Sequence, residues 1–108
     1  MFYILDNKTP VKFDTDTVAD MVKWAEFQQN IKLRRVASTQ VNESLYVSTV
    51  FLGISTYGSD SDGRPYLFET IVFRNGEDDL VRRACSWEEA ETVHKEVLAR
   101  VTTHSVSG

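Results

Sequence analysis

Cysteine, histidine, proline and glycine are scarce in this chain of 108 residues, which contains one Cys, two His, two Pro and five Gly. A single thiol excludes an intramolecular disulfide and a zinc site made of cysteines, and it favours a reducing compartment. No apolar run comes near the ~18 residues that a membrane-spanning helix needs, so we expect no membrane protein. The N-terminus has neither the basic start nor the long apolar stretch of a signal peptide, which predicts a cytoplasmic location.

Basic residues are also few, since 12 Lys and Arg stand against 16 Asp and Glu for a formal net charge of -4. A general nucleic-acid binder normally carries a net basic surface, so this balance argues against that class, although a local basic patch is still possible. Apolar residues make up 42% of the chain, which is enough for one globular domain that folds without a metal or a disulfide. We expect this domain over residues 1–101, followed by a flexible tail over residues 102–108.

Two helices are predicted from apolar residues at helical spacing. Residues 14–17 are all able to cap the N-terminus of the first helix. A second helix follows Ser86–Glu89, which matches a capping box, and its apolar side runs from Trp87 to Val101. In the first helix we expect one buried stripe made of Val18, Met21, Val22, Trp24, Ala25 and Phe27.

The rest of the chain favours strands. Asn75–Gly76 is the strongest hairpin signal, and residues 57–65 have the composition of an exposed loop. Strands are expected at residues 2–5, 11–13, 31–54 (two strands), 66–74 and 80–85. Short turns favour antiparallel pairing, so we predict an α+β fold: a four-stranded antiparallel sheet plus an N-terminal hairpin, with the two helices on one face.

The strand around residues 46–54 is apolar on both of its alternating sides. A strand with one side in water would alternate more cleanly between apolar and polar residues. In so small a chain the second cover is expected to come from another copy. We therefore predict a homo-oligomer, most simply a dimer.

Three segments resemble a family of small uncharacterised proteins encoded mainly by phages and prophages of actinobacteria. They are Ser48–Gly53 (STVFLG), Pro65–Phe73 (PYLFETIVF) and Ser86–His94 (SWEEAETVH), and Arg34–Val41 fits the same pattern. Members of that family often have an Asp-His pair after the glycine, where this chain has Ile54-Ser55. The resemblance implies phage origin, a bacterial cytoplasm and an accessory or host-directed role, but no particular chemistry.

Glu69 is the most unusual position, because it interrupts an otherwise apolar side of a predicted strand. A buried carboxylate costs several kcal/mol unless it is paired. One interpretation is an ion pair with Arg35, Arg82 or Arg83; the other is a ligand-orienting group or a general base. His94 lies on the apolar side of the second helix, where it is either a core histidine or an acid–base partner of Glu69.

The doublets Arg34-Arg35 and Arg82-Arg83 fall in separate predicted strands. Adjacent strand residues point to opposite faces, so neighbouring strands would bring two guanidinium groups together on one face. Such a pair suits a phosphate or a carboxylate. The aromatic residues that could stack on a base beside it, although aromatics in strands more often belong to the core, are Tyr46, Tyr57, Tyr66 and Phe68. The alternative is surface charge paired with some of the acidic residues.

Signals for other chemistry are absent from the sequence. His94 and His104 are ten positions apart, unlike the close ligand pairs of zinc motifs, and we expect no metal and no cofactor. Cys85 has no Cys–His signature and is expected to be a small core residue.

Three functional hypotheses follow from these observations. The first is a non-enzymatic homo-oligomeric module that sequesters a small anionic signal, such as a nucleotide, to counter host defence. The second is a protein-interaction or structural factor that binds a host or virion protein. The third is a small enzyme that uses Glu69 and His94. The ligand-binding residues predicted for the first hypothesis are Arg34, Arg35, Arg82, Arg83, Glu69, Tyr66 and His94.

Overall fold

Hairpins and helices follow one another along the chain, and local turn and cap residues mark most of their ends. The computed structural model describes the backbone of residues 1–107 and the side chains of residues 1–102. The elements are β1 (Phe2–Asp6), β2 (Thr9–Phe13), α1 (Val18–Gln29), α2 (Ile31–Arg34), β3 (Arg35–Asn42), β4 (Leu45–Phe51), β5 (Phe68–Arg74), β6 (Glu77–Ala84) and α3 (Trp87–Ser107). No helix in this part of the chain is long and apolar enough to cross a membrane.

The main sheet has four antiparallel strands in the order β3-β4-β5-β6, and β1 and β2 form a separate two-stranded hairpin. At the β5–β6 turn, Asn75 and Gly76 have φ of 55° and 81°. This left-handed geometry belongs to tight hairpin turns and suits Asn and Gly. The predicted α+β class is confirmed, and so is the predicted hairpin at residues 75–76.

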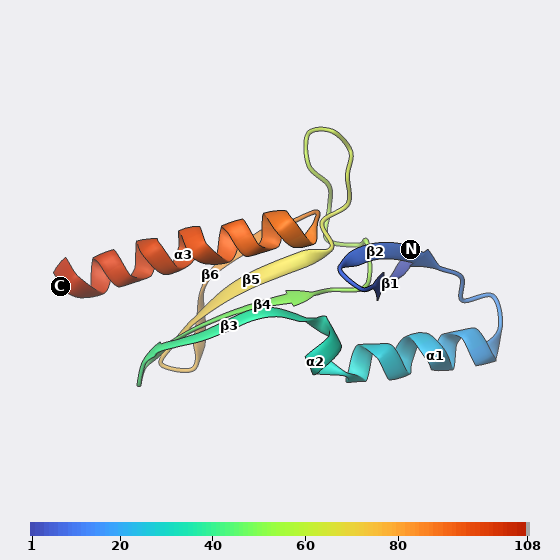
Figure 1. Cartoon of the computed structure of the whole chain (residues 1–108), viewed down its shortest axis with the longest axis horizontal. Helices are drawn as coiled ribbons and strands as arrows, with labels where there is room; N and C mark the ends of the chain where they lie inside the picture. Colours follow the sequence, from blue (N-terminus) through green and yellow to red (C-terminus); the bar gives the residue numbers. More distant parts are fainter. Residues whose placement is uncertain (108) are drawn as a thin grey trace.

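Helix α3 covers one face of the main sheet (Figure 1). Its cap is the expected one, since Ser86 Oγ accepts the backbone N–H of Glu89 at 3.2 Å. The helix continues to Ser107, so the predicted tail from residue 102 is helical as far as that residue, and Gly108 lies outside the described residues.

The core lies between α3 and the sheet. Inward-facing residues of β4 are at most 1% exposed, whereas the alternate residues are only half-buried. Burying one such large apolar side chain contributes about 1.5–3 kcal/mol. The buried core residues of the sheet and α3 are Leu45, Val47, Phe51, Leu67, Phe68, Val72, Ala84, Ala90, Val97 and Val101.

Helix α1 lies at the other end of the molecule from the C-terminus of α3, beneath the β1–β2 hairpin (Figure 1). Trp24 Nε1 donates to the carbonyl oxygens of Tyr3 and Gly53, both at 3.2 Å. The Phe27 ring meets Phe51 edge to face, with ring centroids 6.0 Å apart. Gly53 has a φ of 78°, and a Cβ there would collide with the side-chain amide of Gln28.

The burial expected for the six apolar residues of α1 is correct for only part of them. Trp24 and Phe27 face the protein, but α1 has no fully buried residue. The remaining members of the stripe, Val18, Met21, Val22 and Ala25, are exposed. Helix α1 rests on the hairpin and on the end of β4 rather than along the sheet, so only its Trp24 and Phe27 side has anything to pack against.

Candidate functional site

The two arginine doublets do not form one site. Strands β3 and β6 are the opposite edges of the sheet, with β4 and β5 between them. Convergence required neighbouring strands, and that condition is not met. Arg34 lies at the end of α2, where its guanidinium donates to the carbonyl oxygens of Phe51 at 3.0 Å and Gln28 at 2.7 Å. Partial burial lowers the pKa of Arg34, and its hydrogen bonds fasten α2 to β4.

Glu69 lies on the sheet face away from α3, which we call the open sheet face. Its side chain is 14% exposed, and its Oε2 accepts from Arg83 Nε at 3.2 Å. The Arg83 guanidinium also lies over the Tyr57 ring, 5.2 Å from its centroid. The ion-pair interpretation of Glu69 therefore holds, with Arg83 as the partner. Arg82, one residue earlier on β6, lies on the opposite side because it pairs with inward-facing Thr70.

His94 is a core histidine, 4% exposed. Its Nδ1 is hydrogen-bonded to Thr49 Oγ1 at 2.8 Å and its Nε2 to Thr39 Oγ1 at 3.0 Å. Thr49 is bonded in turn to Thr70 at 2.6 Å. Desolvation lowers the pKa of His94, so the ring is neutral at pH 7. Two inward-facing threonines, Thr39 and Thr49, thus satisfy both nitrogens of an almost fully buried ring.

Glu69 and His94 do not meet. Glu69 pairs with Val50, whereas His94 bonds Thr49, the neighbouring residue of β4. Successive strand residues point to opposite faces, so the sheet itself separates the carboxylate from the imidazole. The acid–base pair, which was the alternative interpretation of these two residues, is therefore not formed.

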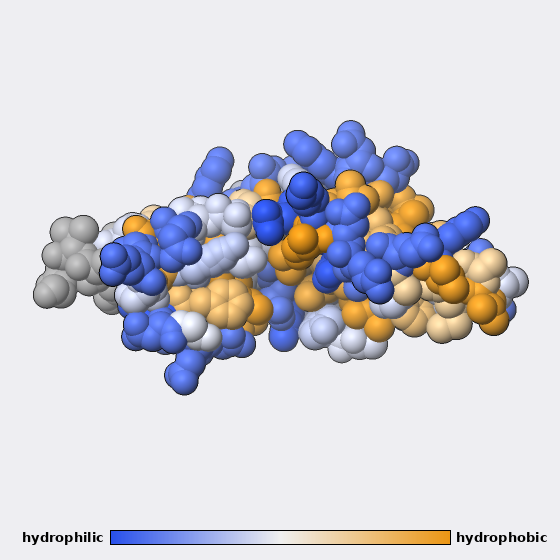
Figure 2. Space-filling view, turned by 90° about the horizontal axis from the view of Figure 1, so that it is seen from below, coloured by the Kyte–Doolittle hydropathy of each residue, from blue (hydrophilic) through white to orange (hydrophobic). Residues whose placement is uncertain are grey.

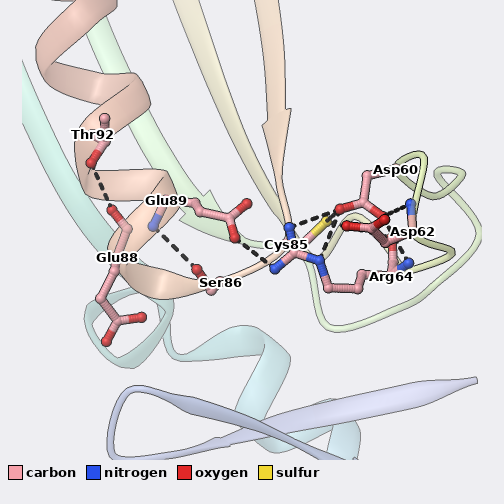
Figure 3. A network of polar contacts seen from close by, with 8 residues as sticks. All are labelled: Asp60, Asp62, Arg64, Cys85, Ser86, Glu88, Glu89 and Thr92. Atoms are coloured by element: carbon pink, nitrogen blue, oxygen red, sulfur yellow. Dashed lines mark hydrogen bonds and ion pairs between the residues drawn. The ribbon is translucent and has the colours of Figure 1, made fainter.

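The loop over residues 57–65 is tied down by Asp60 and Arg64 (Figure 3). Asp60 Oδ1 accepts the backbone N–H of Asp62 and of Arg64 at 3.0 and 2.9 Å, and the Arg64 bond is the main reason that the pKa of Asp60 is lowered. The Arg64 guanidinium bridges Asp60 and Glu89 at 2.8 and 2.7 Å. Glu89 thus binds the loop with its carboxylate while its N–H completes the helix cap.

Tyr66 and Cys85 lie at the base of this loop. The Tyr66 N–H donates to the Gly58 carbonyl at 3.0 Å, and Tyr57 rather than Tyr66 is the aromatic stacked on an arginine. The Cys85 thiol lies 3.4 Å from the Arg64 carbonyl oxygen, and burial raises its pKa. A thiol with a raised pKa is a poor nucleophile at pH 7.

Metal and anion chemistry find little support in the geometry. Among the described side chains, those of residues 1–102, no group of three or more His, Cys, Asp or Glu is placed to hold a metal ion, and His104 lies outside this set. A hollow of about 330 Å³ lies between β6 and α3. Its lining includes Glu88, Glu89 and Glu96 against one arginine, Arg83. Because carboxylates outnumber the one guanidinium in its lining, this hollow repels an anion.

The exposed side of α1 is largely apolar. Val18 is 79% exposed, Met21 52% and Val22 49%, and with Ala25 they have the i, i+3, i+4, i+7 spacing of one helix face. We call these four residues the α1 stripe. Ile31 and Leu33 of α2 are also exposed, at 43% and 55%. Viewed from below, apolar residues gather over the end of the molecule where α1 lies (Figure 2).

Comparisons with known proteins add no relative, because no family model, curated protein or solved structure matches the chain.

The sequence pattern contained the α1 stripe but assigned it to the core. The signal that distinguishes a buried from an exposed apolar side is the position of the large aromatic residues. Trp24 and Phe27 lie on a different side of the helix from Val18 and Met21, so one helix carries two apolar sides.

Proposed function

We propose that this protein is a phage-type accessory protein of the bacterial cytoplasm, and that it works as a homo-oligomeric, non-enzymatic module that binds another protein. The observation that carries this proposal is the exposed α1 stripe. The resemblance to actinobacterial phage proteins supports the accessory role.

The stripe has the form of a helix that docks in an apolar groove. Residues at i, i+3, i+4 and i+7 are the anchors in that mode of recognition. A helix as short as α1, with 12 residues, is marginal by itself in water and depends on packing. A partner that covers Val18, Met21 and Val22 would remove large apolar side chains from water, which favours association.

The other two hypotheses have weaker support. Anion capture needs free guanidinium groups that face one another, but Arg34 is bound to carbonyl oxygens and Arg83 to Glu69. An enzyme needs a base within reach of a substrate, but His94 is enclosed by threonines. The two arginine doublets also lie apart, toward opposite edges of the sheet, which favours protein binding over anion capture.

Site-specific photocrosslinking in a bacterial host tests the proposal. A photoreactive phenylalanine analogue replaces Met21 in the α1 stripe, and a matched variant carries it at Lys95, an exposed residue of α3. We expect one defined protein product from position 21, none from position 95, and loss of the product when Val22→Asp is added. Equal products from both positions, or a product that survives Val22→Asp, would contradict the proposal.

Native mass spectrometry with a panel of cyclic and linear nucleotides tests the same proposal by asking whether the protein binds a nucleotide. We expect an oligomer that retains no nucleotide. A retained nucleotide of unchanged mass would replace protein binding by anion capture, and release of an altered mass would replace it by catalysis.

A further inference from the structure

The two edges of the main sheet differ sharply in charge. Strand β6 has charged residues at five of its eight positions, and charges are a common means of keeping a sheet edge from pairing with another chain. Strand β3, at the other edge, has one charged residue, Arg35 at its first position. From Val36 to Asn42 it has no charge, proline or glycine. The edge of β3 therefore offers backbone N–H and C=O groups without the usual protection.

We propose that the outer edge of β3 pairs with the same strand of a second copy, antiparallel and about a two-fold axis. Two four-stranded sheets would then form one continuous sheet of eight strands. The inference rests on the proposed function, because it names the interface through which the homo-oligomer forms. An antiparallel pair of identical strands is self-complementary, as a two-fold dimer requires.

The charges at the two ends of β3 indicate the register. Arg35 begins the strand, and Glu43 follows its last residue. With the two-fold axis at Thr39, Arg35 lies opposite Glu43 of the partner subunit, and the symmetric pair forms at the other end. Each dimer thus gains two pairs of opposite charge.

The same register places the paired side chains of the two copies on the same face of the sheet. Ser38 lies opposite Gln40 of the partner subunit, and both residues are on the open sheet face because they pair with Ser48 and Tyr46 of β4. The pairing of β3 with β4 is irregular between Arg35 and Ala37 and between Gln40 and Asn42. The regular part of the β3–β4 pairing is therefore short and lies in the middle of β3, where the two-fold axis passes.

This charge pattern favours a second copy over a strand of another protein. One end of the edge is positive and the other negative, so an antiparallel copy neutralises both ends at once. An unrelated strand would need the opposite charges at the same separation.

Charge exchange between Arg35 and Glu43 tests the pairing, because within one chain the two residues are too far apart to interact. Eight residues of extended strand span roughly 27 Å. Arg35→Glu or Glu43→Arg alone places two like-charge pairs in each dimer. We expect either change to raise the dimer dissociation constant roughly 10- to 100-fold, and the double variant to restore it.

Sedimentation equilibrium of the full chain gives these dissociation constants, and circular dichroism checks the fold of each variant. An equimolar mixture of the two single variants should form a heterodimer, since both of its charge pairs are then attractive. Glu77→Arg on the β6 edge is the matched control and should leave the dissociation constant unchanged.

Restoration in the double variant, together with the heterodimer, supports the pairing. A dimer that does not respond to either single change overturns β3 pairing but leaves the proposed homo-oligomer standing. A dimer weakened by both single changes but not restored by the double overturns the register. A native chain that stays monomeric at millimolar concentration overturns both the pairing and the oligomer, whereas partner binding by the α1 stripe is decided separately by crosslinking.

Discussion

Helices α1 and α3 both carry apolar residues at helical spacing, but only α3 has them covered. Ala90, Val97 and Val101 are at most 5% exposed, whereas Val18 and Met21 are 79% and 52% exposed. The difference lies in what each helix rests on. Helix α3 crosses all four strands of the main sheet, and α1 reaches only the hairpin and the end of β4. Helical period thus shows that a helix has an apolar side, while the surface beneath it decides whether that side is buried or exposed.

The largest expected difference comes from the same substitution in each helix. Val97→Asp should lower the free energy of unfolding by about 3–5 kcal/mol, because it buries an unpaired charge. Val22→Asp should change it by no more than about 0.5 kcal/mol, since an exposed residue loses little. Urea denaturation at low protein concentration, where any oligomer would be dissociated, measures both values. Equal losses would mean that α1 is covered within the single chain.

The next expected effect concerns the buried His94 of α3, through which the free energy of unfolding should depend on pH. Burial lowers the pKa of His94 in the folded protein, so the unfolded state binds the proton more readily. Stability should therefore be complete above about pH 6.5, the usual histidine pKa, and fall as the pH drops below it toward the lower folded pKa. The slope from this residue is at most about 1.4 kcal/mol per pH unit.

Urea denaturation at a series of pH values measures this slope, and His94→Gln is the comparison. The variant should lose stability at every pH but should lack the part of the slope that His94 supplies. An identical slope with and without His94 would assign the pH dependence to other groups.

The smallest expected difference is between the two helix caps. Ser86 Oγ accepts the N–H of Glu89 at 3.2 Å, and Thr17 Oγ1 accepts the N–H of Asp20 at 3.1 Å. Ser86→Ala should cost about 1 kcal/mol of global stability, because α3 unfolds only with the sheet. Thr17→Ala should instead increase local opening of α1. Hydrogen exchange of the α1 amides measures that effect, and faster exchange throughout the sheet in Thr17→Ala would contradict it.

Local signals predicted the elements well. Asn75–Gly76 makes the expected turn, Ser86 caps the expected helix, and the strands of the main sheet overlap the expected ones. Several boundaries differ by a few residues. Helix α2 occupies residues 31–34, where strand was expected, and β6 begins at Glu77 rather than at residue 80. Asn30 explains the first, because it ends α1 and its side chain also caps α2.

The candidate site was less predictable. An arginine partner was one of two interpretations of Glu69, and Arg83 fills that role from the next strand. The threonines around His94 could have been found as polar residues on the inward side of predicted strands, but their common partner could not. The arginine doublets depended on strand order, which short-range patterns do not contain.

The sequence by itself determined the helices, the strands, the turns and the presence of an apolar side on each helix. These features depend on backbone sterics and on hydrogen bonds between residues a few positions apart. Tertiary structure alone decided that Glu69 and His94 lie on opposite faces of the sheet, that β3 and β6 are its edges, and that Val18, Met21 and Val22 stay in water. Each of these outcomes depends on contacts between distant segments, and such contacts are set by how the layers pack.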